Sequence, residues 1–166
     1  MKQLVDLISN RKSNRTISKL KDVPLIKKVV ELSYNHNEYN NSVGSAGGIF
    51  GLKLKIFTST VIYSKTIFET KALEPLNFEN IKEVCFSDDE NFTKNSIIIS
   101  IDCDIEKYLN MYGNCGIRYA CIEAGSVIQN IQLLLLENNL QGYIAGYIKN
   151  DDILGLENPL LYYIIY

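Results

Sequence analysis

The sequence predicts an α+β domain in which helices pack on a sheet, and three observations carry this prediction. Residues 96–101 form a continuous isoleucine-rich stretch, which is typical of a central strand. Residues 117–138 form the longest helical pattern of the chain. Helical and strand patterns are interspersed along the sequence. At 166 residues and 46% hydrophobic composition, the chain is long enough for one domain with a core, which we assign to 1–166.

The first half of the chain contains two predicted helices and two predicted strands. The first helix covers residues 2–10. Asp22 is a candidate N-cap and Pro24 fits the first turn of the second helix, which ends near Tyr34. A polar loop and a glycine-rich turn follow. The strands are predicted over 52–58, where apolar and polar residues alternate, and over 61–68.

The second half begins with a predicted helix and ends with a predicted strand. Between them lie the central strand, the long helix, a further strand and a one-turn helix that Asp151 and Asp152 cap. The predicted elements are helix 78–86, strand 96–101, helix 117–138, strand 142–148, the short helix ending at Gly155, and strand 160–166.

Composition excludes several classes of function. The formal net charge of −2 gives no support to nucleic-acid binding. No apolar run approaches the roughly 20 residues that span a bilayer, and the N-terminus has no signal-peptide pattern. We therefore expect a cytoplasmic protein with no membrane partner.

The cysteines do not form a metal motif. The chain has four of them, no Cys-x-x-Cys pair, and His36 as its single histidine, so a zinc site is not expected. Free and mostly buried thiols are the expectation for Cys85, Cys103, Cys115 and Cys121.

The cationic segment, residues 11–15, is the first candidate site. On an extended chain Arg11, Ser13 and Arg15 would point to one side and alternate with Lys12 and Asn14. Two guanidinium groups and a hydroxyl suit a phosphate and an electron-rich ring edge. The alternative is a solvated basic turn.

The glycine turn, residues 44–51, is the second candidate. Its pattern, Gly-x-x-Gly-Gly-x-x-Gly, matches neither the dinucleotide fingerprint nor a phosphate-binding P-loop. Its glycines permit positive φ and close approach of backbone N–H groups to a ligand. The alternative is a tight turn into a strand.

Two polar clusters are weighed as further sites. Asp102 and Asp104 could hold a divalent cation, but acidic residues commonly begin turns at strand ends, and we favour that interpretation. Glu123, Ser126 and Asn130 share one helix face at i, i+3 and i+7. They would meet a ligand, a second subunit or the N-terminal arm, or form a structural polar network.

Three segments together resemble the FMN-dependent nitroreductase superfamily, and most closely its SagB-type branch, the azoline oxidases of thiazole/oxazole-modified peptide pathways. The segments are Arg11-Lys12-Ser13-Asn14-Arg15, Gly44-Ser45-Ala46-Gly47-Gly48, and Tyr112-Gly113-Asn114-Cys115-Gly116-Ile117-Arg118-Tyr119 running on to Asn130. Gly142 and Ala145-Gly146 also fit. Their order and spacing cover nearly the whole chain.

The resemblance implies a dimeric α/β/α sandwich with a central, mostly antiparallel sheet and FMN at the dimer interface. Arg11, Lys12 and Ser13 would bind the phosphate and ribityl chain, and Arg15 would lie near the N1/O2 edge of the ring. Ser45, Ala46 and Gly47 would come from the partner subunit. Backbone N–H groups around Ala145 and Gly146 would approach N5, and the long helix would form much of the dimer core.

The resemblance also implies two versions of the chemistry. One is oxidation of a peptide azoline, and the other is NAD(P)H-dependent reduction of a nitro compound or quinone. The lysine that azoline oxidases commonly carry before Tyr-Gly is Met111 here. We therefore assign proton handling to Tyr112, with Lys107 and Tyr108 as rivals and Arg118 as the nearby cation. The alternative function is a non-catalytic, degenerate subunit of a peptide-modifying complex.

Overall fold

The computed structural model of the chain describes residues 4–15, 22–36, 40–58, 62–67, 69–73, 96–148 and 151–165. The predicted helix over 78–86 and Cys85 lie outside these residues.

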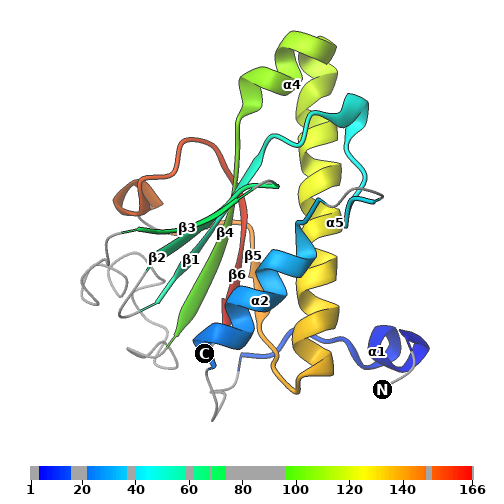
Figure 1. Cartoon of the computed structure of the whole chain (residues 1–166), viewed down its shortest axis with the longest axis vertical. Coiled ribbons are helices and arrows are strands. Elements are labelled where there is room, and N and C mark those ends of the chain that lie inside the picture. The colour runs from blue at the N-terminus through cyan, green and yellow to red at the C-terminus, as the bar shows by residue number, and fades with distance from the viewer. Residues whose placement is uncertain are drawn as a thin grey trace.

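The centre of the fold is a six-stranded sheet whose neighbouring strands all pair antiparallel (Figure 1). The strand order across it is β3-β2-β1-β4-β6-β5. The strands are β1 (Leu52–Phe57), β2 (Ile62–Lys65), β3 (Thr70–Leu73), β4 (Ile97–Cys103), β5 (Tyr143–Ala145) and β6 (Pro159–Ile165).

Strand β4 lies inside the sheet, as its sequence predicts. It pairs with β1 on one side and β6 on the other. All seven of its residues are buried, which explains why it reads as an unbroken run of isoleucines instead of alternating with polar residues.

Two helices cover one face of this sheet (Figure 1). Helix α2 (Val23–Ser33) begins as predicted, because the Asp22 side chain accepts a hydrogen bond from the Leu25 N–H at 3.1 Å and a proline occupies the first turn. Helix α5 (Gly116–Glu137) supplies much of the main core. The opposite face of the sheet is covered by a smaller cluster that includes Ile148 and Leu154.

Two elements were not predicted. Helix α4 (Ile105–Tyr112) leads into a 3-10 turn, η2 (Gly113–Cys115), and then into α5. Strand β3 extends the sheet at the edge beside β2. Both are short, so few residues record their periodicity, and α4 also adjoins α5, whose longer pattern dominates the local sequence.

The segment from Ile105 to Glu137 meets a criterion of length and hydropathy for crossing a membrane. Half of its most apolar window is buried inside the protein, as expected of a helix that packs on a sheet.

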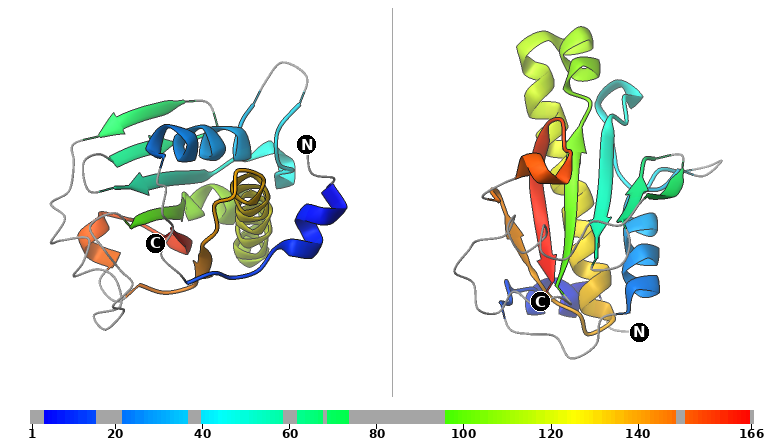
Figure 2. Two further views of the ribbon diagram at one scale, coloured as in Figure 1. Left: turned by 90° about the horizontal axis from the view of Figure 1, so that it is seen from below. Right: turned by 90° about the vertical axis from the view of Figure 1, so that its left-hand side faces the viewer.

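The two candidate segments lie at opposite ends of α5. Helix α1 (Leu4–Asn10), which precedes the cationic segment, lies beside the C-terminal end of α5 (Figures 1 and 2). The glycine turn, with its 3-10 helix η1 (Ala46–Gly48), lies near α4 and the N-terminal end of α5.

Candidate functional site

The cationic segment is tied to the start of β5. The Asn14 N–H donates to the Gly142 carbonyl oxygen at 3.0 Å. The guanidinium carbon of Arg15 lies 4.8 Å from the centroid of the Tyr143 ring, within reach of a cation–π interaction. These two contacts hold Arg15 against the sheet while its side chain remains largely exposed.

The positive charges of this segment have no ion-pair partner among the described carboxylates. In the described ranges, none of Arg11, Lys12 and Arg15 forms an ion pair with a carboxylate. The Ser13 side chain is also exposed. The segment therefore presents three cations and a hydroxyl to solvent from an anchored backbone.

The side chain of Tyr163 stabilises the backbone at Gly142, to which the cationic segment is bonded. The Gly142 N–H donates to the Tyr163 hydroxyl at 2.9 Å. Burial raises the pKa of Tyr163, while hydrogen bonds from Gly142 and Gln132 and the positive charge of Arg11 act in the opposite direction. Position 142 requires glycine, because an added Cβ would lie 2.1 Å from the Ile164 carbonyl oxygen.

The end of β5 adds backbone groups to the same region. Ala145 is buried as the last residue of the strand, whereas Gly146 is exposed with open space where a side chain would be. The cationic segment thus meets the start of β5 through Asn14 and Arg15, and Ala145 and Gly146 follow at the end of the same strand. We call Arg11, Lys12, Ser13, Arg15, Ala145 and Gly146 the arginine half-site.

The glycine turn has the backbone that its sequence predicts. Gly47 and Gly48 have φ values of 60° and 69°, in the left-handed region that favours glycine. The Ser45 Oγ accepts a hydrogen bond from the Phe50 N–H at 3.0 Å, which closes the turn. A Cβ at Gly47 would lie 2.7 Å from both the Met111 Sδ and the Tyr112 hydroxyl oxygen.

Tyr112 therefore lies against the turn, and we call Ser45, Ala46, Gly47 and Tyr112 the glycine half-site. The Tyr112 ring is half-buried and packs on Tyr119, with 4.7 Å between ring centroids. Arg118 is exposed on the first turn of α5. Lys107 is exposed on α4 and pairs with Asp104 at 3.4 Å.

Tyr108 has a different environment from the other three candidates for proton handling. It is fully buried, its hydroxyl donates to the Glu123 Oε2 at 2.8 Å, and the same hydroxyl accepts from the Gly51 N–H at 3.0 Å. Burial and the bond to Glu123 raise the pKa of Tyr108 far above its ordinary value. Such a phenol is a structural hydrogen-bonding group. Tyr112, which is partly exposed, is therefore the better candidate of the two tyrosines for proton handling.

Glu123 receives a second phenol. The Tyr34 hydroxyl donates to its Oε1 at 2.9 Å and accepts from the Leu52 N–H at 3.3 Å. Burial and the negative charge of Glu123 raise the pKa of Tyr34 as well. The sequence marks Glu123 as a polar residue in a buried helix but does not identify its two partners, which are 89 and 15 residues away.

The two half-sites cannot serve one ring within a single protomer. Tyr112 precedes α5 directly, whereas Gly142 follows its end. At about 1.5 Å per residue the 22 residues of α5 extend roughly 33 Å. A ligand that touches both half-sites needs two copies of the chain.

Solved structures provide the comparison that decides the fold. A proposed nitroreductase from Ralstonia eutropha JMP134 superimposes with a TM-score of 0.79, covering 98% of this chain and 82% of that one at 12% identity. The chain has the nitroreductase fold.

Other proteins with this fold match almost the whole chain. A proposed nitroreductase from Desulfovibrio desulfuricans, solved in complex with FMN, matches with a TM-score of 0.68, 13% identity and coverage of 99% and 85%. A chain of the Escherichia coli microcin synthetase McbBCD complex, with truncated pro-MccB17 bound, matches with a TM-score of 0.69 at 17% identity. The match covers 96% of this chain and 71% of that one. No protein-family model and no curated protein matches the sequence.

The polar residues of α5 do not act as one cluster in this nitroreductase fold. Ser126 donates to its own helix at the Ile122 carbonyl and is exposed. The Asn130 side-chain amide donates to the Ser42 and Ser33 carbonyls, at 3.1 and 3.4 Å. Of the alternatives for these three residues, the structural one describes Glu123 and Asn130, which form hydrogen bonds to other elements of the chain, whereas Ser126 bonds only to its own helix.

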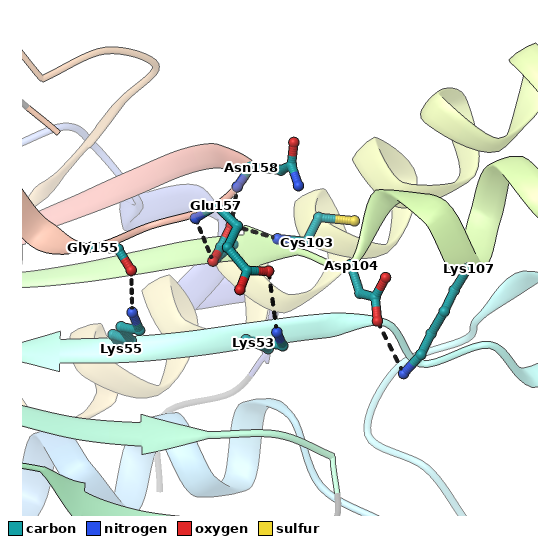
Figure 3. A network of polar contacts seen from close by, with 9 residues as sticks. Lys53, Lys55, Cys103, Asp104, Lys107, Gly155, Glu157 and Asn158 are labelled. Atoms are coloured by element: carbon teal, nitrogen blue, oxygen red, sulfur yellow. Dashed lines mark hydrogen bonds and ion pairs between the residues drawn. The ribbon is translucent and has the colours of Figure 1, made fainter. Parts of the chain in front are cut away.

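The acidic pair Asp102 and Asp104, at the C-terminal end of β4, is structural. Asp102 accepts hydrogen bonds from the backbone N–H groups of Cys103, Glu157 and Asn158, at 2.9, 3.2 and 2.6 Å. Figure 3 shows the surrounding contacts, including Lys107 with Asp104. Among the residues that the structure describes, no group of three His, Cys, Asp or Glu is arranged to hold a metal ion.

The prediction of mostly buried cysteines was wrong for the described part of the chain. Cys103 is buried, but Cys115 and Cys121 are exposed. Cys121 lies on the outer side of α5, next to the exposed Ile122. The helical pattern of α5 does not distinguish which apolar residues face the sheet.

Proposed function

We propose that the protein is an FMN-dependent oxidoreductase that acts as a homodimer. The single observation that supports it best is the pair of half-sites, one cationic and one glycine-rich, at opposite ends of the central helix of a nitroreductase fold. FMN is also the ligand bound to the matching Desulfovibrio desulfuricans protein.

The arginine half-site fits the anionic part of FMN. A phosphate needs cationic or N–H donors, and guanidinium groups provide two donors in one plane. Arg11, Lys12 and Ser13 would hold the phosphate and the ribityl hydroxyls, since they are exposed and none pairs with a described carboxylate. Arg15 would lie along the ring edge, where its charge favours the anionic reduced form.

The glycine half-site fits the flat face of the ring. The turn exposes backbone at Gly47 and Gly48, which a ligand can approach closely. In the proposed dimer this turn belongs to the partner, and Ala145 and Gly146 contribute backbone N–H groups at the other side.

The outer side of α5 supports a two-fold interface. Ile122 is 64% exposed, and Gly125 and Ser126 beside it are small and lie at the middle of the helix. A two-fold axis here would run the two α5 helices antiparallel and bring each arginine half-site to the partner's glycine half-site. Apolar side chains exposed on α1 and α5 would be covered: Leu4, Val5, Ile8 and Ile117.

When bound, FMN accepts or donates a hydride at its N5 atom. The chain itself would orient the substrate and move a proton. Tyr112 is the residue proposed for this role, because it is partly exposed at the glycine half-site. The exposed Arg118, on the first turn of α5, is the cation proposed to assist it.

Two reaction classes are compatible with such a site. One is oxidation of a peptide azoline, which the likeness to a chain of a microcin synthetase complex favours. The other is reduction of a nitro compound or quinone with NAD(P)H as the electron donor. The second candidate function is a non-catalytic, flavin-binding or scaffold subunit of a peptide-modifying complex, which the absence of a lysine before Tyr112-Gly113 favours.

Titration of the purified chain with FMN tests the proposal. We expect a yellow protein that retains flavin through gel filtration at the mass of a dimer. Added NAD(P)H or dithionite should bleach the flavin, and a bound flavin that neither reductant bleaches would favour the scaffold alternative. A colourless protein that takes up no added FMN would overturn both functions.

A further inference from the structure

We propose that Glu123 is a positioning residue: acting through Tyr108, it fixes the glycine turn in the conformation that meets the ligand. The inference about the turn stands on the contacts of this chain, and its consequence for flavin rests on the proposed function.

The first step is the chemistry of Glu123. Its side chain is 1% exposed, and each carboxylate oxygen accepts a hydrogen bond from a phenol. No described lysine, arginine or histidine pairs with it. A buried carboxylate without a cation is costly and rarely adds net stability, so its effect is better sought in what it orients.

The second step is the direction of the Tyr108 hydroxyl. A phenol has one proton to donate, and here it is given to Glu123. The lone pairs of the oxygen are therefore turned toward the Gly51 N–H, which donates to it at 3.0 Å. Without an acceptor at position 123, the hydroxyl proton would be free to turn toward Gly51 and repel that N–H.

The third step is that Tyr108 is fully buried and packs closely against two glycines. A Cβ at Gly51 would lie 2.5 Å from the Tyr108 Cε2, and a Cβ at Gly116 would lie 2.4 Å from the Tyr108 carbonyl oxygen. Glycine therefore occupies both positions that approach Tyr108 most closely, Gly51 at its ring and Gly116 at its backbone. The Tyr108 ring thus packs against the end of the glycine turn, and the Tyr108 backbone packs against the start of α5.

The fourth step is that α4 contacts both parts of the turn. Tyr108 holds Gly51, and Tyr112, one helical turn later, lies against Gly47. Between these contacts Phe50 has a φ of 45°, which is unfavourable for a non-glycine residue. A strained turn held at two points needs the buried acceptor that fixes one of them.

Two matched variants test the inference. Tyr108→Phe and Tyr34→Phe each delete one buried hydroxyl that donates to Glu123 and accepts one backbone N–H. They differ in the backbone N–H that loses its acceptor. Tyr108→Phe releases the N–H of Gly51, whereas Tyr34→Phe releases the N–H of Leu52, the first residue of β1. Amide hydrogen exchange of the full chain should rise about tenfold in peptides covering 44–51 for Tyr108→Phe and less than threefold for Tyr34→Phe.

Glu123→Gln supplies the second measurement. Its amide offers one acceptor oxygen for two phenols, so exchange of 44–51 should rise in the same direction as for Tyr108→Phe. Combining the two changes should add little, since both act through one contact. Equal exchange of 44–51 in both phenylalanine variants, or additive effects of Glu123→Gln and Tyr108→Phe, would overturn the inference.

Flavin affinity separates this inference from the proposed function. If the unchanged protein binds FMN, Tyr108→Phe should raise the dissociation constant several-fold more than Tyr34→Phe at a matched loss of thermal stability. If the unchanged protein binds no FMN, the proposed function fails, and the exchange data alone still decide whether Glu123 positions the turn.

Discussion

At the scale of single residues, the conformation of the glycine turn depends on the absence of side chains. Gly47 has a φ of 60°, and a Cβ added there would lie 2.7 Å from the Tyr112 hydroxyl oxygen, so a side chain would meet both backbone strain and a collision. Gly44 has neither restriction, since nothing lies within 4 Å of its missing Cβ and its φ is not positive.

Gly47→Ala should therefore destabilise the protein by about 1–2 kcal/mol, the cost of a left-handed conformation for an alanine. Urea unfolding measures this difference. Gly44→Ala is the matched control and should change the free energy of unfolding by less than about 0.5 kcal/mol. Equal effects at the two positions would contradict the observed turn geometry.

The three described cysteines should differ sharply in reactivity. Burial raises the pKa of the Cys103 thiol to about 12, whereas Cys115 and Cys121 are exposed. Because the thiolate is the nucleophile, iodoacetamide at pH 8 should alkylate Cys115 and leave Cys103 unmodified until the protein unfolds, whereas Cys121 should be protected to the extent that the proposed dimer covers the outer side of α5. Peptide mass spectrometry with and without urea checks this, and early labelling of Cys103 would show that β4 opens readily.

Arg15 is the residue on which the cofactor proposal depends most directly. Arg15→Ala should weaken FMN retention about tenfold and lower the flavin reduction potential, because a cation beside the anionic reduced ring is lost. Lys28→Ala removes an exposed cation of α2 and serves as the control. If both variants retain flavin with an unchanged potential, the position assigned to Arg15 is incorrect.

At the scale of elements, helix α2 shows how local sequence fixes a boundary. Its N-terminal amide is capped by the side chain of Asp22. Asp22→Ala should cost about 1 kcal/mol of stability, whereas Asp22→Asn should be nearly neutral because asparagine caps equally well. Thermal unfolding of the two variants distinguishes the loss of a cap from the loss of a charge.

The elements also show what the sequence could and could not predict. Strand β4 was recognisable because it is buried on both faces, which gives a continuous apolar run. Helix α5 was recognisable because one side packs on the sheet, which gives a helical period of apolar residues over 22 positions. Helix α4 and strand β3 are short, so few residues record their periodicity. The cationic segment and glycine turn could be found as motifs, but the pairing of Glu123 with Tyr34 and Tyr108 depends on tertiary contacts that no local pattern encodes.

At the scale of the whole molecule, the buried phenols and thiol make stability depend on alkaline pH. The pKa values of Tyr34, Tyr108 and Cys103 are raised in the folded state above their ordinary values of 10.0, 10.0 and 9.0. Above pH 9 the unfolded chain therefore holds fewer protons than the folded one, and unfolding is favoured as the pH rises.

Urea unfolding between pH 8 and 11 should show stability falling from about pH 9 upward. Each such group contributes a slope of up to about 1.4 kcal/mol per pH unit once its unfolded form is ionised. Tyr34→Phe should reduce the slope above pH 10 while leaving the thiol contribution. A flat profile to pH 11 would mean that these groups are accessible to hydroxide in the folded protein.

The separation of the two half-sites along α5 has a consequence for mixtures of variants. A protomer impaired at its arginine end and another impaired at its glycine end would each be inactive alone. In a mixed pair of the proposed dimer, one of the two composite pockets would carry both substitutions and the other would carry neither. Complementation between two dead proteins would thus recover function, which a site contained within a single subunit can never do.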